Sequence, residues 1–315
     1  MNFSLTQLSY IVAVDTYRHY VKAAQDCCVS QPTLSMQIKK MEESVGQNIF
    51  DRTKQPLVPT ELGVLLIEQA RKILAESEKI NELVQIHNGE VYGKLSIGII
   101  PTLAPYLLPR FIGDFSRQYP QVSLSVKELN TKDIISMLQR DIIDVGILVT
   151  PLEEQSLTEE PLFYEEFKVY MNLRSGLSKK AISIEELINH KLWLLNEGNC
   201  FRDQTINLCA SDQINNNEIS FEYESGSLNT LIKMVDIEGG ATLIPELAVL
   251  DLDKEKVKQV RDIKSTKIPL REVSIVYSRR QAKKRIIKHL KKSIMDNVPQ
   301  SMIEAKGEVL DIYVK

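Results

Sequence analysis

Two cysteines are the residues of this sequence whose chemistry and spacing first indicate a function. Cys200 and Cys209 lie nine positions apart in the stretch from residue 197 to residue 209. If this stretch is helical, their Cα atoms are about 13–14 Å apart, at a rise of roughly 1.5 Å per residue. A disulfide requires a Cα separation of only about 4.4–6.8 Å. The two thiols can therefore join only if the segment between them unwinds, which is the behaviour of a redox switch.

The residues around Cys200 favour reactivity. Asn199 is a preferred N-cap residue, so we predict that a helix begins there and that Cys200 lies in its first turn. Free backbone N–H groups and the positive end of the helix dipole stabilise a thiolate at this position. Arg202 adds a second positive charge nearby in the sequence. We therefore expect the Cys200 thiol to ionise readily and to react with oxidants.

Other interpretations of the cysteines are open when the residues are considered alone. Buried cysteines are common core residues, so Cys200 and Cys209 could be purely structural. A zinc site is disfavoured, because no further Cys or His lies at ligand spacing and His190 is isolated. We expect neither a metal nor another cofactor. Cys27 and Cys28 are interpreted as packing or surface thiols.

The composition is that of an ordinary folded protein. The chain has 315 residues, of which 43% are hydrophobic and 26% charged, and its net charge is −3. This length suffices for two or three units with cores of their own. The first twenty residues lack a basic start followed by a long apolar core, so we expect a cytoplasmic protein without a membrane span. A disulfide in that reducing compartment would be transient or regulatory.

The first sixty residues predict a small helical domain of the kind that binds DNA. Ser4 and Gln7 form a capping box for a first helix, and residues 21–26 indicate a short second helix. Ser30 caps a third helix, which has Pro32 near its start. The core side of this third helix carries Leu34, Ile38, Met41 and Val45. A short polar helix packed on two others is suited to the DNA major groove.

Residues 50–59 follow with alternation and turn residues, which predict a small two-stranded wing. Residues 1–60 carry six basic and five acidic side chains, so the pattern rather than the local charge indicates DNA binding. The side chains that we expect to contact DNA are Ser30, Gln31, Pro32, Thr33, Ser35, Lys39, Lys40 and Arg52.

This part of the chain resembles a known family. The residues that carry the resemblance are Ala23 and Ala24, residues 29–35, Gln37 and Ile38, Met41 and Glu42, Val45 and Gly46, Ile49 and Phe50, Arg52, and residues 57–63. They are similar to the N-terminal domain of LysR-type transcriptional regulators, in a match that is nearly gap-free across about sixty residues. The resemblance implies a winged helix-turn-helix.

A long helix is predicted next, from the N-cap Thr60 to about residue 87, where no proline interrupts the chain. Its apolar stripe consists of Leu62, Leu66, Ala70, Ile73, Ile80, Leu83 and Val84. One helix cannot bury such a stripe alone. The family resemblance implies a linker helix that pairs with its twin in a homodimer, with a homotetramer as the larger assembly.

The remainder alternates between strand-like and helical patterns. Residues 94–100, 122–128, 144–149 and 167–172 are strand-like, and residues 107–119 and 133–140 are helical. This alternation predicts an α/β fold with largely parallel sheets. The resemblance implies a two-lobed regulatory domain, Rossmann-like and similar to periplasmic binding proteins, with a cleft between the lobes. Chain crossings between the lobes are expected near residues 162–166 and 266–270.

We therefore predict a winged helix-turn-helix over residues 1–60 and a linker helix over residues 61–89. The regulatory domain covers residues 90–301, with lobe I at 90–164 and 268–301 and lobe II at 165–267. Residues 302–315 form a tail that no sequence pattern interprets. The basic run 279–292 is expected to be the solvated face of a helix, because Ile286, Ile287, Leu290 and Ile294 form an apolar stripe beneath its charges.

Within this family, the chain resembles the OxyR-type hydrogen peroxide sensors. The residues concerned are Gly98, residues 100–102, residues 105–109, Gly198, Cys200, residues 202–204, Cys209, Ser227 and Leu228, Thr230 and Leu231, and Met234 and Val235. The resemblance implies that peroxide converts Cys200 to a sulfenic acid, which condenses with the resolving Cys209.

The same resemblance assigns a peroxide pocket. Its expected residues are Thr102, Thr131, Asn199, Arg202, Asp203 and Arg271. The two threonines match positions whose hydroxyls hold peroxide near the sulfur, and the last residue matches a nearby arginine. The chain departs from the family at Asn199, where histidine is usual. Asparagine can donate a hydrogen bond but cannot carry a proton or a positive charge.

The sequence thus predicts a peroxide-sensing regulator that activates oxidative-stress genes, with double-stranded DNA, hydrogen peroxide, RNA polymerase and a thiol reductant as partners. One alternative is a regulator of the same architecture that binds a small-molecule effector in its cleft and has structural cysteines. Another is a thiol peroxidase. We expect no enzyme, because a catalyst has no use for a winged helix, and no catalytic triad, P-loop or dinucleotide motif occurs.

Overall fold

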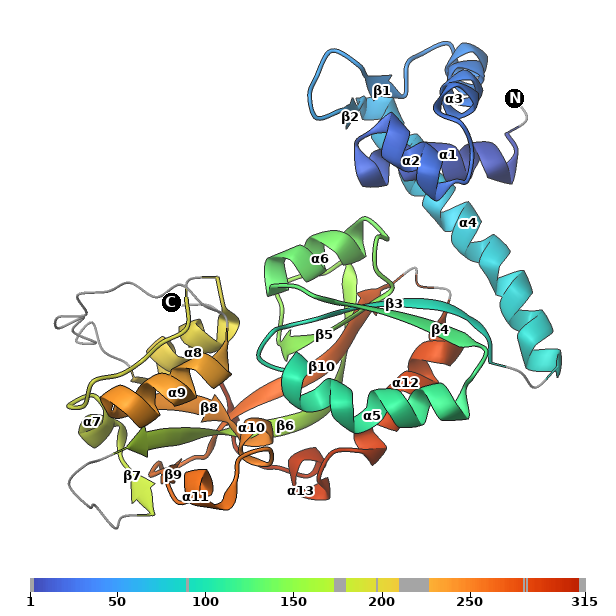
Figure 1. Ribbon diagram of the computed structural model, residues 1–315. Helices are drawn as coiled ribbons and strands as arrows, with labels where there is room; N and C mark the ends of the chain where they lie inside the picture. Colours follow the sequence, from blue (N-terminus) through green and yellow to red (C-terminus); the bar gives the residue numbers. More distant parts are fainter. Residues whose placement is uncertain are drawn as a thin grey trace.

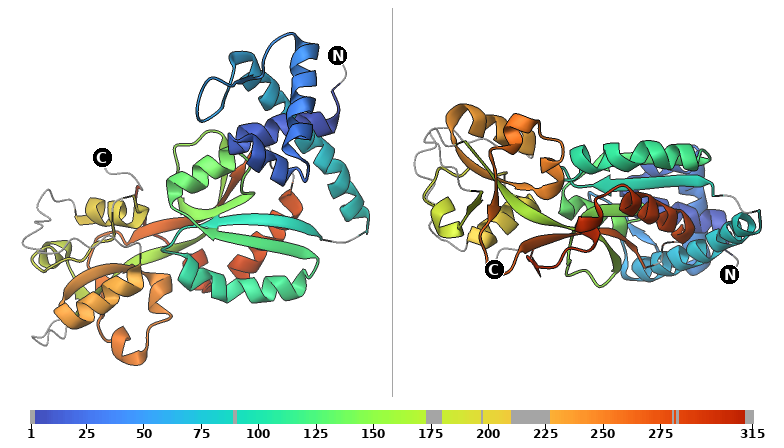
Figure 2. Two further views of the ribbon diagram at one scale, coloured as in Figure 1. Left: turned by 45° about the horizontal axis from the view of Figure 1, so that its top comes forward. Right: turned by 90° about the horizontal axis from the view of Figure 1, so that it is seen from below.

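The computed structural model describes residues 3–88, 91–172, 180–196, 198–209, 227–279, 281 and 283–311. It has three parts: a small helical head, a long helix and a two-lobed α/β domain (Figure 1). Viewed from two further directions, the head lies beside one lobe and away from the other (Figure 2). No helix among the described residues combines the length and the apolar character that crossing a membrane would require.

The head is built from α1 (Leu5–Tyr17), α2 (Tyr20–Asp26) and α3 (Gln31–Val45). The predicted capping box is present, since the Ser4 hydroxyl accepts from the Gln7 backbone N–H at 3.1 Å and the Gln7 side chain accepts from the Ser4 backbone N–H at 3.1 Å. Ser30 caps α3 in the same way, by accepting from the Thr33 backbone N–H. These local bonds begin α1 and α3 where the sequence predicted.

The wing consists of β1 (Phe50–Asp51) and β2 (Val58–Pro59), which pair antiparallel. The buried carboxylate of Glu42 on α3 accepts from the backbone N–H groups of Ile49 and Phe50, and also from Arg52. This carboxylate therefore fastens the wing to α3.

Some apolar residues of helix α4 (Glu61–Asn88) are buried in the first half of the helix, and others are exposed in the second half. In its first half, Ala70 of the expected stripe is buried in the core of the head together with Ile67, and Leu66 of the stripe packs against that core. In its second half, Ile80 and Leu83 are 63% and 65% exposed. Part of the apolar stripe of α4 therefore finds its partner within the chain, because the head needs α4 to close its own core, and pairing with a twin through the exposed part stays a prediction.

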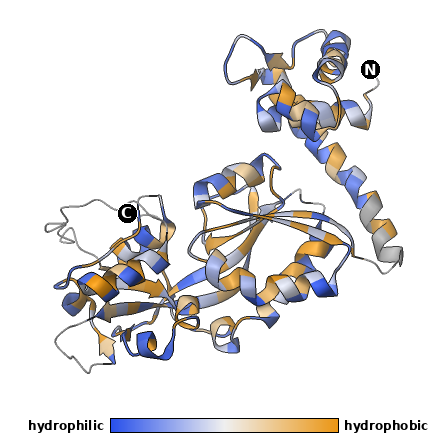
Figure 3. Ribbon diagram, viewed as in Figure 1, coloured by the Kyte–Doolittle hydropathy of each residue, from blue (hydrophilic) through white to orange (hydrophobic). Residues whose placement is uncertain are grey.

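Lobe I contains the parallel strands β3 (Gly93–Ile99), β4 (Val122–Glu128) and β5 (Val145–Thr150). Helices α5 (Ala104–Gln118), α6 (Thr131–Gln139) and α12 (Lys284–Asp296) belong to it. Hydrophobic residues alternate with hydrophilic ones along these helices (Figure 3). The predicted stripe of α12, including Ile286 and Leu290, is buried.

Two long strands connect the lobes. In β6 (Leu157–Asn172), the antiparallel partner changes from β10 (Pro269–Ser278) to β8 (Gly240–Pro245) after Glu166. The expectation of largely parallel sheets was wrong, because these strands run in opposite directions through the centre of the domain. The sequence also placed the start of β6 ten residues too late, at 167, because the charged residues of its first half do not alternate like a half-buried strand.

Lobe II holds the two cysteines. Its helices are α7 (Ile184–Leu187), α8 (Cys200–Cys209), α9 (Leu228–Glu238), α10 (Glu246–Val249) and α11 (Lys254–Val257). Its remaining strands are β7 (Ala181–Ile182) and β9 (Val260–Ile263). Beyond α12, the chain forms α13 (Gln300–Ile303) and β11 (Glu308–Val309). Residues 312–315 of the predicted tail, which include the end of a strand-like run over residues 309–314, lie outside the described residues, as does Glu197.

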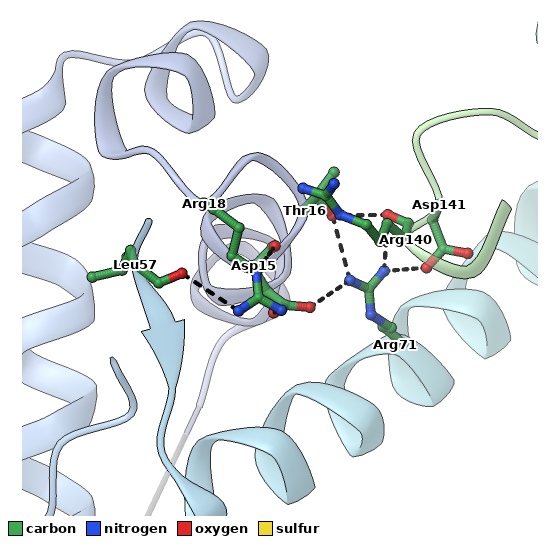
Figure 4. Close-up of polar contacts among 7 residues, drawn as sticks. All are labelled: Asp15, Thr16, Arg18, Leu57, Arg71, Arg140 and Asp141. Carbon is green, nitrogen blue, oxygen red and sulfur yellow. Dashed lines mark hydrogen bonds and ion pairs between the residues drawn. The ribbon is translucent and has the colours of Figure 1, made fainter. Parts of the chain in front are cut away.

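A buried arginine joins the head to lobe I (Figure 4). On α4, Arg71 donates to Asp15 at 2.9 Å and also bonds to Asp141, in the turn between α6 and β5. The Thr16 hydroxyl of α1 donates to the Arg140 carbonyl of the same turn at 2.9 Å. Three segments that are distant in sequence therefore meet around one guanidinium.

Replacing Arg71 by methionine should weaken this junction. Arg18 still pairs with Asp15 in such a variant, so we expect a loss of about 2 kcal/mol, below the cost of leaving a buried charge unpaired. Hydrogen exchange of the α1 amides, measured by mass spectrometry, reports the change as local stability. The control is Arg117→Met, whose ion pair with Asp114 is exposed and should matter by less than about 0.5 kcal/mol. Equal effects of the two substitutions would contradict the assignment.

Candidate redox site and nucleic-acid interface

Helix α8 carries one cysteine at each end, as the spacing predicted. The Asn199 side chain accepts from the Phe201 backbone N–H at 3.1 Å, and the Asn199 carbonyl accepts from the Arg202 backbone N–H at 2.9 Å. These bonds begin the helix at the expected cap. Because α8 is helical from Cys200 to Cys209, the two Cα atoms are about 13–14 Å apart. Both cysteines are buried and both are free thiols.

Cys200 lines a cavity of about 340 Å³ between the lobes. Lobe I contributes residues that precede and begin α6, and lobe II contributes the residues around the start of α8. The described lining residues are Ile100, Pro101, Glu128, Leu129, Asn130, Thr131, Asp133, Asn196, Gly198, Asn199 and Cys200. The cavity therefore brings Thr131 and Asn199, two of the predicted pocket residues, together with Cys200.

Close packing of α6 positions Thr131. The Asn130 side chain caps this helix by accepting from the Asp133 backbone N–H at 2.8 Å. A Cβ added to Gly146 would meet a side-chain carbon of Ile134 at 2.6 Å, so only glycine on β5 lets α6 approach this closely. The helix then places its first residue at the cavity together with Cys200, and the Thr131 side chain lowers the pKa of that thiol.

A buried arginine lies beneath the cysteine. Arg271 is 0% exposed and pairs with Glu165, which is also 0% exposed, at 2.6 Å. The guanidinium donates to the Thr102 hydroxyl at 3.1 Å and lies 5.0 Å from the ring centroid of Phe201. Glu165 in turn accepts from the Leu247 backbone N–H at 3.1 Å. Because both charges are paired, this arginine is fixed in place rather than free to move toward a ligand.

Burial dominates the ionisation of Cys200. It raises the pKa of the Cys200 thiol above the ordinary value, although Arg271, the Thr131 hydrogen bond and the Phe201 backbone N–H each lower that pKa. The expectation that this thiol ionises readily was therefore wrong, since removal of a thiolate from water outweighs the helix start. Burial likewise raises the pKa of Cys209, to about 11.

The remaining predicted pocket residues are not among the described residues that line the cavity. Arg202 is directed to the Leu195 carbonyl at 3.5 Å and is not among the residues that lower the pKa of Cys200. The Asp203 carboxylate raises that pKa. Thr102 is buried as a partner of Arg271 and is absent from the described lining. The positive charge that acts on the sulfur thus comes from β10 rather than from α8.

Several residues of the site were missed by sequence reasoning. Glu128, Asp133 and Asn196 line the cavity, and Glu165 holds the buried arginine. Asn130, a good N-cap before an apolar helical run, gave a signal that could have extended the prediction of α6 from residue 133 back to Thr131. No local pattern indicates Glu165, because its partner lies 106 positions away.

The head presents the expected polar surface. The predicted DNA-contacting residues on α3 and its cap are exposed, apart from Ser35, which is half-buried. The opposite side of α3 is buried through Leu34, Ile38 and Met41. Arg52 differs from the rest, because it donates to Glu42 at 2.9 Å and lies 5.9 Å from the ring centroid of Tyr20. Through these contacts Arg52 fastens the wing to α3 and α2.

Family models match both the head and the two-lobed domain. Residues 5–64 match the bacterial regulatory helix-turn-helix domain of the lysR family, and residues 88–298 match the LysR substrate binding domain. The chain therefore belongs to the LysR family of helix-turn-helix regulators.

The chain is also similar to individual members of this family. The hydrogen peroxide-inducible genes activator of Dickeya chrysanthemi is 35% identical over 248 residues, which are 78% of this chain and 80% of that protein. The DNA-binding transcriptional dual regulator OxyR of Escherichia coli is 34% identical over the same shares. Full-length OxyR from Pseudomonas aeruginosa, with a cysteine-to-aspartate substitution, superposes with a TM-score of 0.77 at 32% identity, covering 94% of this chain and 99% of that one. An H2O2-bound cysteine mutant of Corynebacterium glutamicum OxyR gives a TM-score of 0.59 at 25% identity, covering 94% and 93%.

The raised pKa predicts how the reactivity of Cys200 depends on pH. In a variant whose other three cysteines are serine, alkylation by iodoacetamide should accelerate about tenfold per pH unit between pH 7 and 9, because only the thiolate reacts. The rate constant should not level off below the ordinary pKa of 9.0. A plateau that begins below pH 8 would show that Arg271 outweighs burial. The double variant Arg271→Met/Glu165→Gln, which removes both buried charges together, should slow alkylation at pH 8 further.

Proposed function

We propose that this protein is a transcription regulator that senses hydrogen peroxide by oxidation of Cys200 and formation of a disulfide with Cys209. One observation carries the proposal: a thiol in the first turn of α8 lines a cavity of about 340 Å³ between the lobes, and a second thiol lies on the same helix, about 13–14 Å away. The names of the relatives, which are peroxide-inducible activators and OxyR proteins, support the same stimulus.

The chemistry takes place in two steps. The Cys200 thiolate attacks one peroxide oxygen, the O–O bond breaks, and the departing hydroxide takes up the proton of the thiol to leave as water. The Cys209 thiol then attacks the sulfenic sulfur, so that the S–S bond forms, the S–O bond breaks and a second water leaves. Two thiols have lost two electrons, and one peroxide has become two waters. Thr131 and Asn199 are suited to hold peroxide, since both line the cavity with hydrogen-bonding groups.

The second step converts chemistry into a change of shape. The sulfurs cannot meet while α8 is helical, so the disulfide form must unwind this helix. A covalent bond biases such a two-state element strongly. Rearrangement of lobe II then alters how copies of the chain pack together, and with it the spacing of the α3 helices on DNA. A cellular thiol reductant resets the switch.

Dimerisation through α4 follows from its exposed second half. In that half, Ile80 and Leu83 are 63% and 65% exposed, and a helix surface of this kind requires a partner. We propose that a second copy covers it and that the dimer pairs further into a tetramer. Two α3 helices would then read two half-sites of double-stranded DNA, with RNA polymerase as the further partner.

The cavity argues against a regulator that answers to an organic anion. Glu128 and Asp133 line it, and none of its described lining residues is Lys or Arg. An anionic effector would meet like charge there, which lowers affinity. A small neutral molecule such as peroxide meets no such penalty.

Loss of thiols tests the sensing mechanism. After brief exposure to peroxide, the unaltered chain should lose two of its four thiols, and non-reducing peptide mapping should join Cys200 to Cys209. Cys200→Ser should lose none and show an unchanged DNA footprint with peroxide, whereas Cys209→Ser should stop at the sulfenic acid. A peroxide-dependent footprint in Cys200→Ser would sink the proposal.

Substitutions on the head separate two kinds of DNA contact. Gln31→Ala should weaken the binding free energy for the operator by about 1–3 kcal/mol and make the protein less selective for the operator sequence, as expected for loss of a base contact. Lys40→Ala should weaken binding to all DNA sequences. It should also reduce the slope of log K against log salt concentration by about one, as expected for loss of one phosphate contact. The control is Lys292→Ala on α12, whose basic face we interpret as solvated and which should change neither quantity. A reduced salt slope in the control would assign that face to DNA instead.

A further inference from the structure

The C-terminal segment, which the sequence left without interpretation, is built into the regulatory domain. Residues 308–309 form strand β11, which pairs parallel with the start of β10 at Pro269 and Leu270. The Glu308 backbone N–H donates to the Ile268 carbonyl at 2.9 Å, and the Leu310 backbone N–H donates to the Leu270 carbonyl at 2.9 Å. The segment therefore adds a short strand beside the residues that lead directly into Arg271.

Close contact at Gly307 sets the position of this strand. A Cβ at this residue would lie 2.3 Å from the Ile268 carbonyl oxygen and within 3 Å of the Leu270 side chain. A backbone oxygen cannot move aside as a side-chain end can. Any larger residue at position 307 must therefore push β11 away from β10.

The same segment reaches the helix that carries the cysteines. The Gln204 side chain donates to the Leu310 carbonyl at 3.1 Å, and the Asn207 side chain donates to the Asp311 carbonyl at 3.5 Å. Gln204 is 0% exposed. Both side chains belong to the part of α8 between Cys200 and Cys209, which must unwind for the sulfurs to meet.

We propose that residues 307–311 are a latch that holds α8 in its helical form and so limits the rate at which Cys200 and Cys209 join. The strand fixes the carbonyl groups of Leu310 and Asp311 to lobe I through β10, and those carbonyls hold the middle of α8. The latch resists the unwinding of α8. It does not affect the attack of peroxide on Cys200, which takes place in the cavity at the start of α8, whereas the latch contacts Gln204 and Asn207. This inference rests on the proposed function, because it concerns the second step of that switch.

The two steps of oxidation should respond differently when the latch is removed. Truncation after Lys306 should accelerate the condensation of Cys200 with Cys209 on the order of tenfold, as the loss of two hydrogen bonds from the helical form predicts. The rate of sulfenic acid formation, measured in the Cys209→Ser background by trapping with a sulfenic-acid-specific reagent, should change less than about twofold. The control truncation after Asp311 retains the latch and should match the full chain.

Point substitutions keep the test independent of truncation. Gly307→Val should reproduce the faster condensation in a full-length chain, whereas Lys306→Ala, at the preceding exposed residue, should not. Oxidation of the unaltered chain should also release the latch, so that hydrogen exchange at the backbone N–H groups of Glu308 and Leu310 increases several-fold.

The outcomes distinguish the two proposals. If the unaltered chain forms no disulfide between Cys200 and Cys209, the proposed function fails. If the disulfide forms at the same rate in the full chain, in the Lys306 truncation and in Gly307→Val, the latch is overturned while the switch stands. Equal acceleration of sulfenic acid formation and of condensation would also overturn the latch, because the truncation would then act at the peroxide cavity rather than on the unwinding of α8.

Discussion

The separation of two sulfurs by an intact helix is the constraint on which the rest of this structure depends. A helix places residues nine positions apart about 13–14 Å from each other, and a disulfide cannot span that distance. The helical form of α8 and the S–S bond are therefore mutually exclusive. Every contact that stabilises α8, including the Asn199 cap and the stacking of Phe201 on Phe167 at 5.3 Å, raises the free energy of the disulfide form relative to the dithiol form. Residues that contact α8 therefore affect this free-energy difference without any change to either cysteine.

The cavity between the lobes imposes a second compromise. Burial protects Cys200 from large reagents, but it also raises the pKa of the thiol and reduces the reactive fraction. Arg271 offsets this effect in part, although its charge is shared with Glu165. A cavity of about 340 Å³ admits a small molecule to the sulfur.

Helix α6 has one end at the sulfur and the other at the head. Its first residue, Thr131, lines the cavity together with Cys200 and lowers the pKa of that thiol, and the turn after its last residue contacts Arg71 and Thr16. Between these ends, Ile134 packs against Gly146 too closely for any side chain to intervene. The redox site and the DNA-binding head are thus connected through one short, tightly packed element of lobe I, in addition to the linker helix α4.

Features that depend on near neighbours could be predicted from the sequence alone. Caps such as Ser4, Ser30 and Asn199 act within three residues, and the apolar periodicity of α3 and α12 repeats within two turns, so helix starts and buried faces could be predicted. The separation of Cys200 and Cys209 followed in the same way. The tertiary structure alone decided the pairing of Arg271 with Glu165, the division of the α4 stripe between the head and the surface, and the place of residues 307–311. It also reversed the expected ionisation of Cys200. These features depend on burial and on partners as far as 106 positions apart, and neither is encoded in the pattern of a local segment.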